Sequence, residues 1–100
     1  MNIHFHTKNL KLTPQVKEYI ETKLERIIKY AGKESKDIRE IHIDLSYSPQ
    51  HRSEEKVRVE VNIDLYHGQK ILRAAERAED LEKGIDLVQK KLERQIEKMK

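Results

Sequence analysis

The apolar residues of this chain recur either at every second position or at every third or fourth position, and segments with these two patterns follow one another along the sequence. In residues 57–65, valine, isoleucine and leucine alternate with charged or polar residues, which predicts a β-strand with one apolar face. The same alternation predicts two more strands, at residues 2–8 and 41–47, and residues 71–78 are interpreted as a shorter fourth strand that follows a hairpin turn. In residues 14–30, and again after residue 80, the apolar residues recur every three or four positions, which predicts two amphipathic helices.

Residues that typically start or end helices and turns flank these segments. Thr13 is expected to cap the first helix, because a side-chain oxygen can accept a hydrogen bond from the first turn, and Pro14 suits the first helical position. Gly32 is expected to end that helix in a left-handed conformation. Gly68 is expected to form a hairpin turn between the last two strands, and Asp80 to cap the second helix.

The predicted element order is β-α-β-β-β-α, which belongs to the α+β class. A strand–helix–strand unit normally forms a right-handed crossover between parallel strands, and the last three strands follow one another closely enough to form an antiparallel meander. Because each helix has one apolar stripe and each strand one apolar face, the simplest arrangement is a four-stranded mixed sheet with both helices on the same face. We expect residues 1–100 to form one domain.

The charged residues of both helices are sorted onto separate flanks. In the second helix, Glu82, Asp86, Glu93 and Glu97 lie on one flank of the apolar stripe, and the back and other flank carry Lys83, Lys90, Lys91, Arg94 and Lys98. In the first helix, one flank carries Glu18, Glu21 and Glu25, and the other side carries Tyr19, Lys23, Arg26, Lys29 and Tyr30. Two such helices side by side could pool their basic flanks into one surface that neutralises RNA phosphates, with tyrosines stacking on bases.

Ten basic residues are therefore candidates for contacts with RNA phosphates. Eight of them are on the helices: Lys23, Arg26, Lys29, Lys83, Lys90, Lys91, Arg94 and Lys98. Arg73 and Arg77 of the last predicted strand complete the set, although the alternation leaves open whether they face the helices or point away. The competing interpretation is that the charges only solvate the helix surfaces, aided by i,i+4 pairs such as Glu79–Lys83 and Asp86–Lys90.

The remaining composition narrows the function classes. The chain has 100 residues, a net charge of +3 and a pI near 9.1, which favours an anionic partner. The absence of cysteine rules out disulfides and thiolate chemistry. We expect a cytoplasmic protein without a membrane partner, because no secretory or membrane-spanning apolar run is present. We expect no enzyme, cofactor or small-molecule substrate, because no phosphate loop or hydrolase motif occurs.

Five histidines raise the possibility of a metal site. His4 and His6 share one face of the first predicted strand, and His42 on a neighbouring strand could face the same way. Three imidazoles would suit zinc or copper. That face of the sheet is predicted to be solvated, however, and no acidic partner for the imidazoles is evident from the sequence. We therefore predict no metal site.

Two long segments resemble the ribosome hibernation-promoting factor family, also called ribosome-associated inhibitor A or sigma-54 modulation protein. "IHFHTKNLKLTPQVKEYIETKLERIIKY" is similar to the family's first strand and threonine-initiated helix. "LRAAERAEDLEKGIDLVQKKLERQI" is similar to the family's last segment at Arg73-Ala74, Asp80-Leu81, Ile85-Asp86 and the run Lys91-Leu92-Glu93-Arg94-Gln95. Glu82, Lys83 and Gly84 depart from the family's usual Tyr-Ala-Ala. Gly84 would cost the helix about 1 kcal/mol relative to alanine, unless it permits close packing.

The resemblance implies a fold like that of double-stranded-RNA-binding domains, and a partner in the small ribosomal subunit and its 16S-type rRNA. A protein of this kind would occupy the mRNA/tRNA channel and stabilise inactive, hibernating ribosomes under stress or in stationary phase. The length resembles either the family's short form, which lacks a dimerisation domain, or the N-terminal domain of its long form, and we expect a monomer off the ribosome. Two alternatives stay open: a protein-interaction domain that uses the acidic flanks or an open sheet edge, and a general RNA-binding domain without ribosome specificity.

Overall fold

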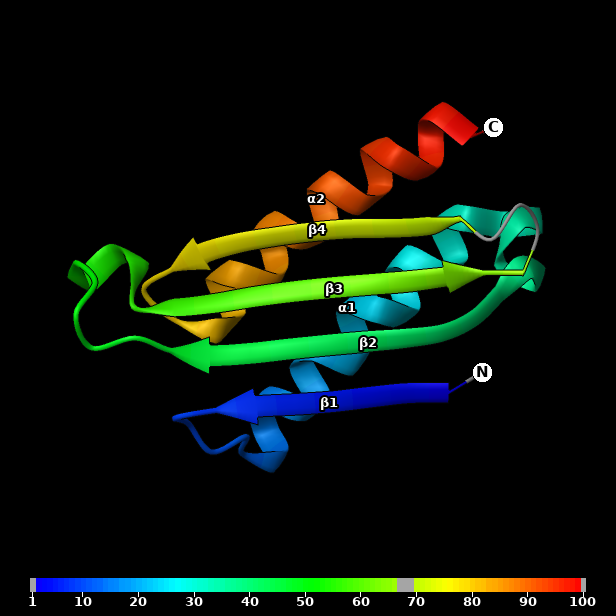
Figure 1. Ribbon diagram of the computed structural model, residues 1–100. Helices are drawn as coiled ribbons and strands as arrows, with labels where there is room; N and C mark the ends of the chain where they lie inside the picture. The colour runs from blue at the N-terminus through cyan, green and yellow to red at the C-terminus, as the bar shows by residue number, and fades with distance from the viewer. Residues whose placement is uncertain (1, 67–69, 100) are drawn as a thin grey trace.

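The computed structural model describes residues 2–66 and 70–99 and confirms the order β-α-β-β-β-α (Figure 1). The main elements are β1 (Asn2–Lys8), α1 (Pro14–Ala31), β2 (Ile38–Tyr47), β3 (Val57–Leu65), β4 (Ile71–Ala78) and α2 (Leu81–Met99), with short 3₁₀ turns at Gly32–Asp37 and Ser53–Glu55. β2 begins three residues before the segment that its alternation predicted. The hairpin turn predicted at Gly68 lies outside the described residues.

The four strands form one mixed sheet in the order β1-β2-β3-β4. β1 pairs with β2 in parallel, whereas β2 with β3 and β3 with β4 are antiparallel, so the predicted parallel pair and meander are confirmed. The register places Phe5 beside Ile43, Ile43 beside Val61, and Val61 beside Ala74. Because side chains alternate across a strand, this register aligns the apolar faces of all four strands.

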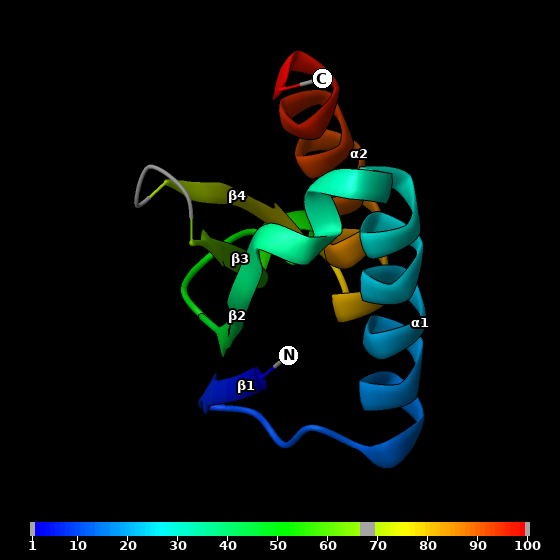
Figure 2. The same ribbon diagram turned by 90° about the vertical axis from the view of Figure 1, so that its right-hand side faces the viewer.

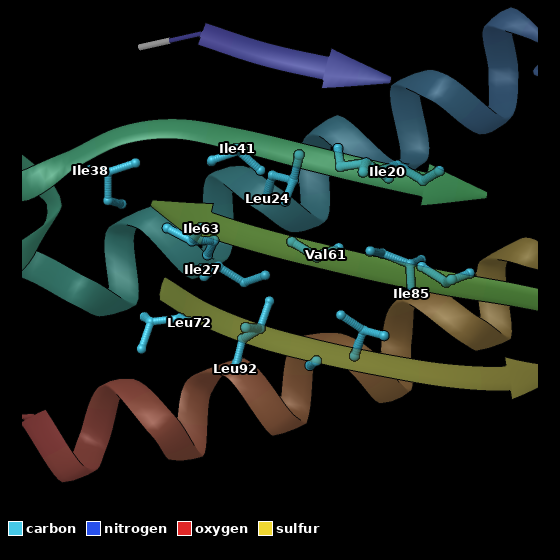
Figure 3. Close-up of a cluster of buried hydrophobic side chains, with 14 of the residues drawn as sticks. Ile20, Leu24, Ile27, Ile38, Ile41, Val61, Ile63, Leu72, Ile85 and Leu92 are labelled. Carbon is cyan, nitrogen blue, oxygen red and sulfur yellow. The ribbon is translucent and has the colours of Figure 1, made fainter. Parts of the chain in front are cut away.

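Both helices cover the same face of the sheet, as predicted (Figure 2). The core lies between the layers, where side chains from both helices meet those of the central strands (Figure 3). Its most buried members, each at most 1% exposed, include Ile20, Leu24, Ile41, Val61, Ile63, Ile85 and Leu92. Burying each such side chain contributes roughly 1.5–3 kcal/mol. Neither helix, within the described ranges, is apolar enough along its length to cross a membrane.

The predicted helix caps are present, with one difference at the end of α1. The Thr13 hydroxyl accepts a hydrogen bond from the Val16 N–H at 3.2 Å, and the Asp80 carboxylate accepts one from the Lys83 N–H at 2.8 Å. Gly32 has the predicted positive φ of 60°, but its ψ of −117° lies outside the left-handed helical region. Helix α1 therefore does not end in a simple left-handed cap, and the chain continues directly into the 3₁₀ turn.

Gly84 allows α2 to pack closely on the sheet. A Cβ atom at this position would lie 2.6 Å from Cγ2 of Val59 and 3.8 Å from Cβ of Ala78. Val59 is fully buried in β3 and β-branched, so it has little freedom to move aside. The glycine that weakens the isolated helix thus permits the contact between α2 and the strands beneath it.

Candidate nucleic-acid interface

The two helices lie side by side and run in the same direction, as Figure 2 shows. Two tyrosine–carboxylate hydrogen bonds join them. Tyr19 donates to Asp86 Oδ1 at 2.8 Å, and Tyr30 donates to Glu97 Oε2 at 2.7 Å. The two tyrosines are about three helical turns apart, as are the two carboxylates, so the contacts follow a parallel seam between α1 and α2. Tyr19 and Tyr30, which were predicted to stack on bases at an RNA surface, instead use their hydroxyls to join the two helices.

Lys23 also lies in this seam. Its Nζ is 3.3 Å from Asp86 Oδ1 and 5.1 Å from the centre of the Tyr19 ring, and its side chain is only 16% exposed. The basic flank of α1 therefore faces the acidic flank of α2. The prediction that the two basic flanks pool into one surface is wrong at this position, and the charge sorting has a structural role between the helices. The predicted Asp86–Lys90 ion pair does not form either, because Asp86 interacts with α1.

Two further candidates on α2 are occupied by acidic partners. Lys91 lies 2.8 Å from Glu76 Oε1 on β4 and donates to the Ala75 carbonyl at 3.3 Å. Lys83 pairs with Glu79, as its i,i+4 spacing predicted. The charges of these two lysines are already compensated within the chain, so each would have to exchange a carboxylate for a phosphate in order to bind RNA.

Five of the predicted cations remain unpaired on the helix layer. Within residues 2–66 and 70–99 no hydrogen bond or ion pair involves them, and all are exposed. We call them the outer cation set: Arg26, Lys29, Lys90, Arg94 and Lys98. At about 100° per residue, Lys29 and Lys90 lie nearly opposite the buried stripes of their helices. The set therefore belongs to the surface of the helix layer that faces away from the sheet.

Three members of the outer cation set form a row along α2. Lys90, Arg94 and Lys98 recur every four residues, about one helical turn apart. Like charges at this spacing destabilise a helix by a few tenths of a kcal/mol per pair. A polyanion whose phosphates follow the row would turn this repulsion into attraction. The arrangement is suited to a nucleic-acid backbone.

Arg73 and Arg77 lie on the other face of the sheet, away from the helices. Arg73 is in register with Asn62 and donates from Nε to its Oδ1 at 2.6 Å. Arg77 donates to the carbonyl oxygen of Glu55 at 3.4 Å. Asn62 also donates to Glu60, and this hydrogen bond is the main cause that holds the pKa of the Glu60 carboxyl below its usual range. The structure therefore does not bring these two arginines together with the helix cations.

The sequence reasoning missed how α2 covers the edge of β4. The Arg73 N–H donates to Gln95 Oε1 at 3.2 Å, and Gln95 Nε2 donates to the Arg73 carbonyl at 2.7 Å. Both backbone groups of this edge residue are thus satisfied by one side chain, which blunts the edge for strand addition. No local pattern points to this pairing, because Gln95 lies 22 residues from its partner.

The Tyr19–Asp86 contact predicts a change in stability at alkaline pH. The hydrogen bond to Asp86 is the main cause that raises the pKa of Tyr19 above its usual value of 10.0. The bond needs the protonated phenol, so its stabilisation is fully present below about pH 10 and is lost as the pH rises through the raised pKa. We expect Tyr19→Phe to lower the free energy of unfolding by about 1 kcal/mol at pH 8.

Urea unfolding followed by circular dichroism at pH 8 and at several pH values above 10 would measure this effect. The difference between wild type and Tyr19→Phe should shrink as the pH rises. Tyr47→Phe is the matched control, since no hydrogen bond from its hydroxyl occurs within the described ranges. An equal stability of wild type and Tyr19→Phe at pH 8 would contradict the role assigned to the bond.

Comparisons with known proteins agree with this architecture. Residues 3–100 match the family described as sigma 54 modulation protein / S30EA ribosomal protein. A curated relative, the ribosome hibernation promotion factor of Staphylococcus aureus (strain COL), is 33% identical over the whole chain, which spans 48% of that protein's length. Two solved structures are similar: a ribosomal subunit interface protein from Coxiella burnetii (TM-score 0.78, 27% identity, 99% of this chain and 97% of that one) and the N-terminal domain of Thermus thermophilus Protein Y (TM-score 0.77, 29% identity, both chains fully covered).

Proposed function

Because the chain belongs to the sigma 54 modulation protein / S30EA ribosomal protein family, we propose that it binds ribosomes and holds them in a translationally inactive state. The observation that carries the proposal is the outer cation set, five unpaired basic side chains on the side of the helix layer that faces away from the sheet. The names of its relatives, a hibernation promotion factor and a subunit interface protein, support a ribosomal partner.

The proposed partner surface is rRNA of the small subunit, in the channel that messenger and tRNA otherwise occupy. Lys90, Arg94 and Lys98 would follow the phosphates of one strand, while Arg26 and Lys29 reach from α1. Occupation of the channel would exclude messenger and tRNA by steric overlap and by competition for the same phosphates. The role is stoichiometric binding rather than catalysis, and the proposed location is the cytoplasm, where ribosomes are.

Co-sedimentation with vacant ribosomes and with separated subunits tests the proposal. We expect about one copy per small subunit, displaced by added tRNA and messenger. If five phosphates are neutralised, the logarithm of the binding constant should fall with the logarithm of salt concentration with a slope of roughly −4. Failure of the protein to pellet with ribosomes or the small subunit at any salt concentration would refute it.

Competition with unrelated RNA distinguishes a general RNA-binding role from the proposed ribosome-specific one. Excess duplex RNA of unrelated sequence should displace a general binder from ribosomes at concentrations that titrate its phosphates. A protein that recognises the shape of the small-subunit channel should be displaced only weakly. Efficient displacement would therefore favour the RNA-binding alternative over the ribosomal one, and it would leave the outer cation set as the contact surface.

A protein partner is the second candidate function, and one feature of the structure favours it. β1 is an edge strand, and a groove between it and α1 is lined by Ile3 and Ile28 together with the acidic flank Glu18, Glu21 and Glu25. An extended basic peptide could add to this edge and place its cations beside the glutamates. Such binding would survive charge reversal in the outer cation set, which distinguishes it from both RNA-binding alternatives.

A further inference from the structure

The face of the sheet opposite the helices carries a cluster of imidazole and carboxylate groups on β1 and β2. The parallel register places His4 directly beside His42, and their rings stack with centroids 4.7 Å apart. Glu40 precedes His42 by two residues and therefore projects from the same face of β2. Its Oε1 lies 3.7 Å from His4 Nε2, and its Oε2 lies 3.4 Å from His42 Nε2.

These three side chains bring one possible metal-binding atom each into the same small region. One ligand atom from each of His4, Glu40 and His42 lies within 4.8 Å of the other two. Around a tetrahedral zinc ion with bonds of about 2.0–2.1 Å, ligand atoms are separated by roughly 3.4 Å. Binding one ion requires the two imidazoles to rotate out of their near-parallel stack so that both rings point at the metal, while the β1–β2 ladder holds the three backbones in place.

The His4 imidazole supplies an independent sign of a missing ligand. Its Nε2 is shielded from solvent and has no hydrogen-bond partner. Within the described part of the chain, no other side-chain nitrogen or oxygen is both buried and unpaired. The 3.7 Å separation from Glu40 is too long for a hydrogen bond. Buried polar atoms are rarely left unpaired, and a metal ion between His4 and Glu40 would satisfy both.

His6 is placed to orient the His42 ring. Its Nε2 lies 3.5 Å from His42 Nδ1, on the side of that ring away from Glu40. Histidines that bind metals usually donate a hydrogen bond from their other nitrogen, which selects the tautomer and raises the basicity of the metal-binding nitrogen. A hydrogen bond from His42 Nδ1 to His6 Nε2 would leave the Nε2 lone pair of His42 for the metal.

We propose that His4, Glu40 and His42 bind a divalent transition-metal ion, for which zinc is the best fit. Two imidazoles and one carboxylate are a donor set that zinc accepts, with its fourth position open to water, whereas magnesium and calcium prefer oxygen donors alone. This proposal departs from the prediction of no metal site, which rested on the lack of an evident acidic partner for the imidazoles. The acidic partner was overlooked because Glu40 lies before the residues that were predicted as the second strand. The site is on the face opposite the outer cation set, so it extends the proposed function without depending on it.

Zinc titration of the purified protein without a polyhistidine tag tests the proposal. Isothermal titration calorimetry should show one zinc ion per chain and no comparable binding of magnesium. His4→Gln, Glu40→Gln and His42→Gln should each weaken zinc binding by at least about tenfold, and His6→Ala by roughly tenfold or more. His51→Gln is the matched control, because this exposed histidine lies in the loop between β2 and β3, and it should bind zinc like the wild type.

Nitrogen-15 spectra of the imidazoles in the wild-type protein provide a second measurement that does not depend on variants folding. Addition of zinc should shift the Nε2 signals of His4 and His42 and leave those of His51 unchanged. The proposal is overturned if zinc in clear excess over protein produces no heat and no shift. It is also overturned if His42→Gln binds zinc as tightly as the wild type.

Discussion

Reversing Lys90, Arg94 and Lys98 together to glutamate should abolish co-sedimentation with ribosomes at moderate salt. Each side chain is exposed and unpaired within the described residues, so each can contact a phosphate in the proposed complex. If each lost contact costs about 1.4 kcal/mol, the three reversals weaken binding on the order of 10³-fold. The salt dependence of the residual binding should flatten, because fewer counterions are released.

The fold should tolerate these three substitutions. Exposed positions that make no specific contact usually change stability by about 0.5 kcal/mol or less each. The new glutamates also stand near Glu93, Glu97 and the C-terminal end of α2, so we expect a modest loss of stability that leaves the protein folded. Thermal unfolding would verify this. A matched control reverses Lys8, Lys11 and Lys36, three exposed lysines outside the two helices, and produces the same net charge. If both triple variants lose binding equally, the effect is one of net charge, and the assignment of the α2 row is wrong.

Gly84→Ala should destabilise the protein, although alanine is the better helix former. Helix propensity alone predicts a gain of about 1 kcal/mol. The added methyl group would lie 2.6 Å from Cγ2 of the buried Val59, and inserting a methylene-sized group into a packed core typically costs 1–3 kcal/mol. We expect packing to prevail, with a net loss of about 1 kcal/mol and a fall in melting temperature of roughly 4–8 °C.

A double-mutant cycle identifies the cause. Val59→Ala removes the methyl groups that a side chain at position 84 would meet, so Gly84→Ala should be much less harmful in that background, with a coupling energy above about 0.5 kcal/mol. Chemical denaturation of the four proteins measures it. Stabilisation by Gly84→Ala in the wild-type background would show that α2 can move away from β3, and that the close approach does not explain the glycine.

Most of the fold was predictable because it is encoded locally. The apolar alternation of β3 and the Thr13 cap both depend on residues that are only a few positions apart in the sequence. Gly32 marks the limit of such reasoning, because its positive φ was predicted but its ψ depends on the 3₁₀ turn that follows. β2 began earlier than predicted for a related reason: its first residues pair with β3 through an irregular register between Ile38 and Glu40.

The candidate interface was predictable only in part. Lys90 and Lys29 lie on the outer surface because helical periodicity alone puts them opposite the buried stripe. Lys23 lies on the correct helix flank, but nothing in its own segment indicates that Asp86, far along the chain, will face it. The same holds for Glu40 and His4, whose proximity requires the parallel pairing of β1 with β2.

The sequence by itself determined the elements, their order and the apolar side of each, because these properties follow from interactions between near neighbours. Only the tertiary structure decided which flank of one element faces which flank of another. It pairs Tyr19 with Asp86, 67 residues away in the sequence, and places Lys23 between the helices rather than with the outer cation set. It also brings His4, Glu40 and His42 together on the open face of the sheet. The physical reason is that both helices bury their apolar stripes against one sheet, which determines how their flanks face each other. Gly84 allows α2 to pack closely on β3.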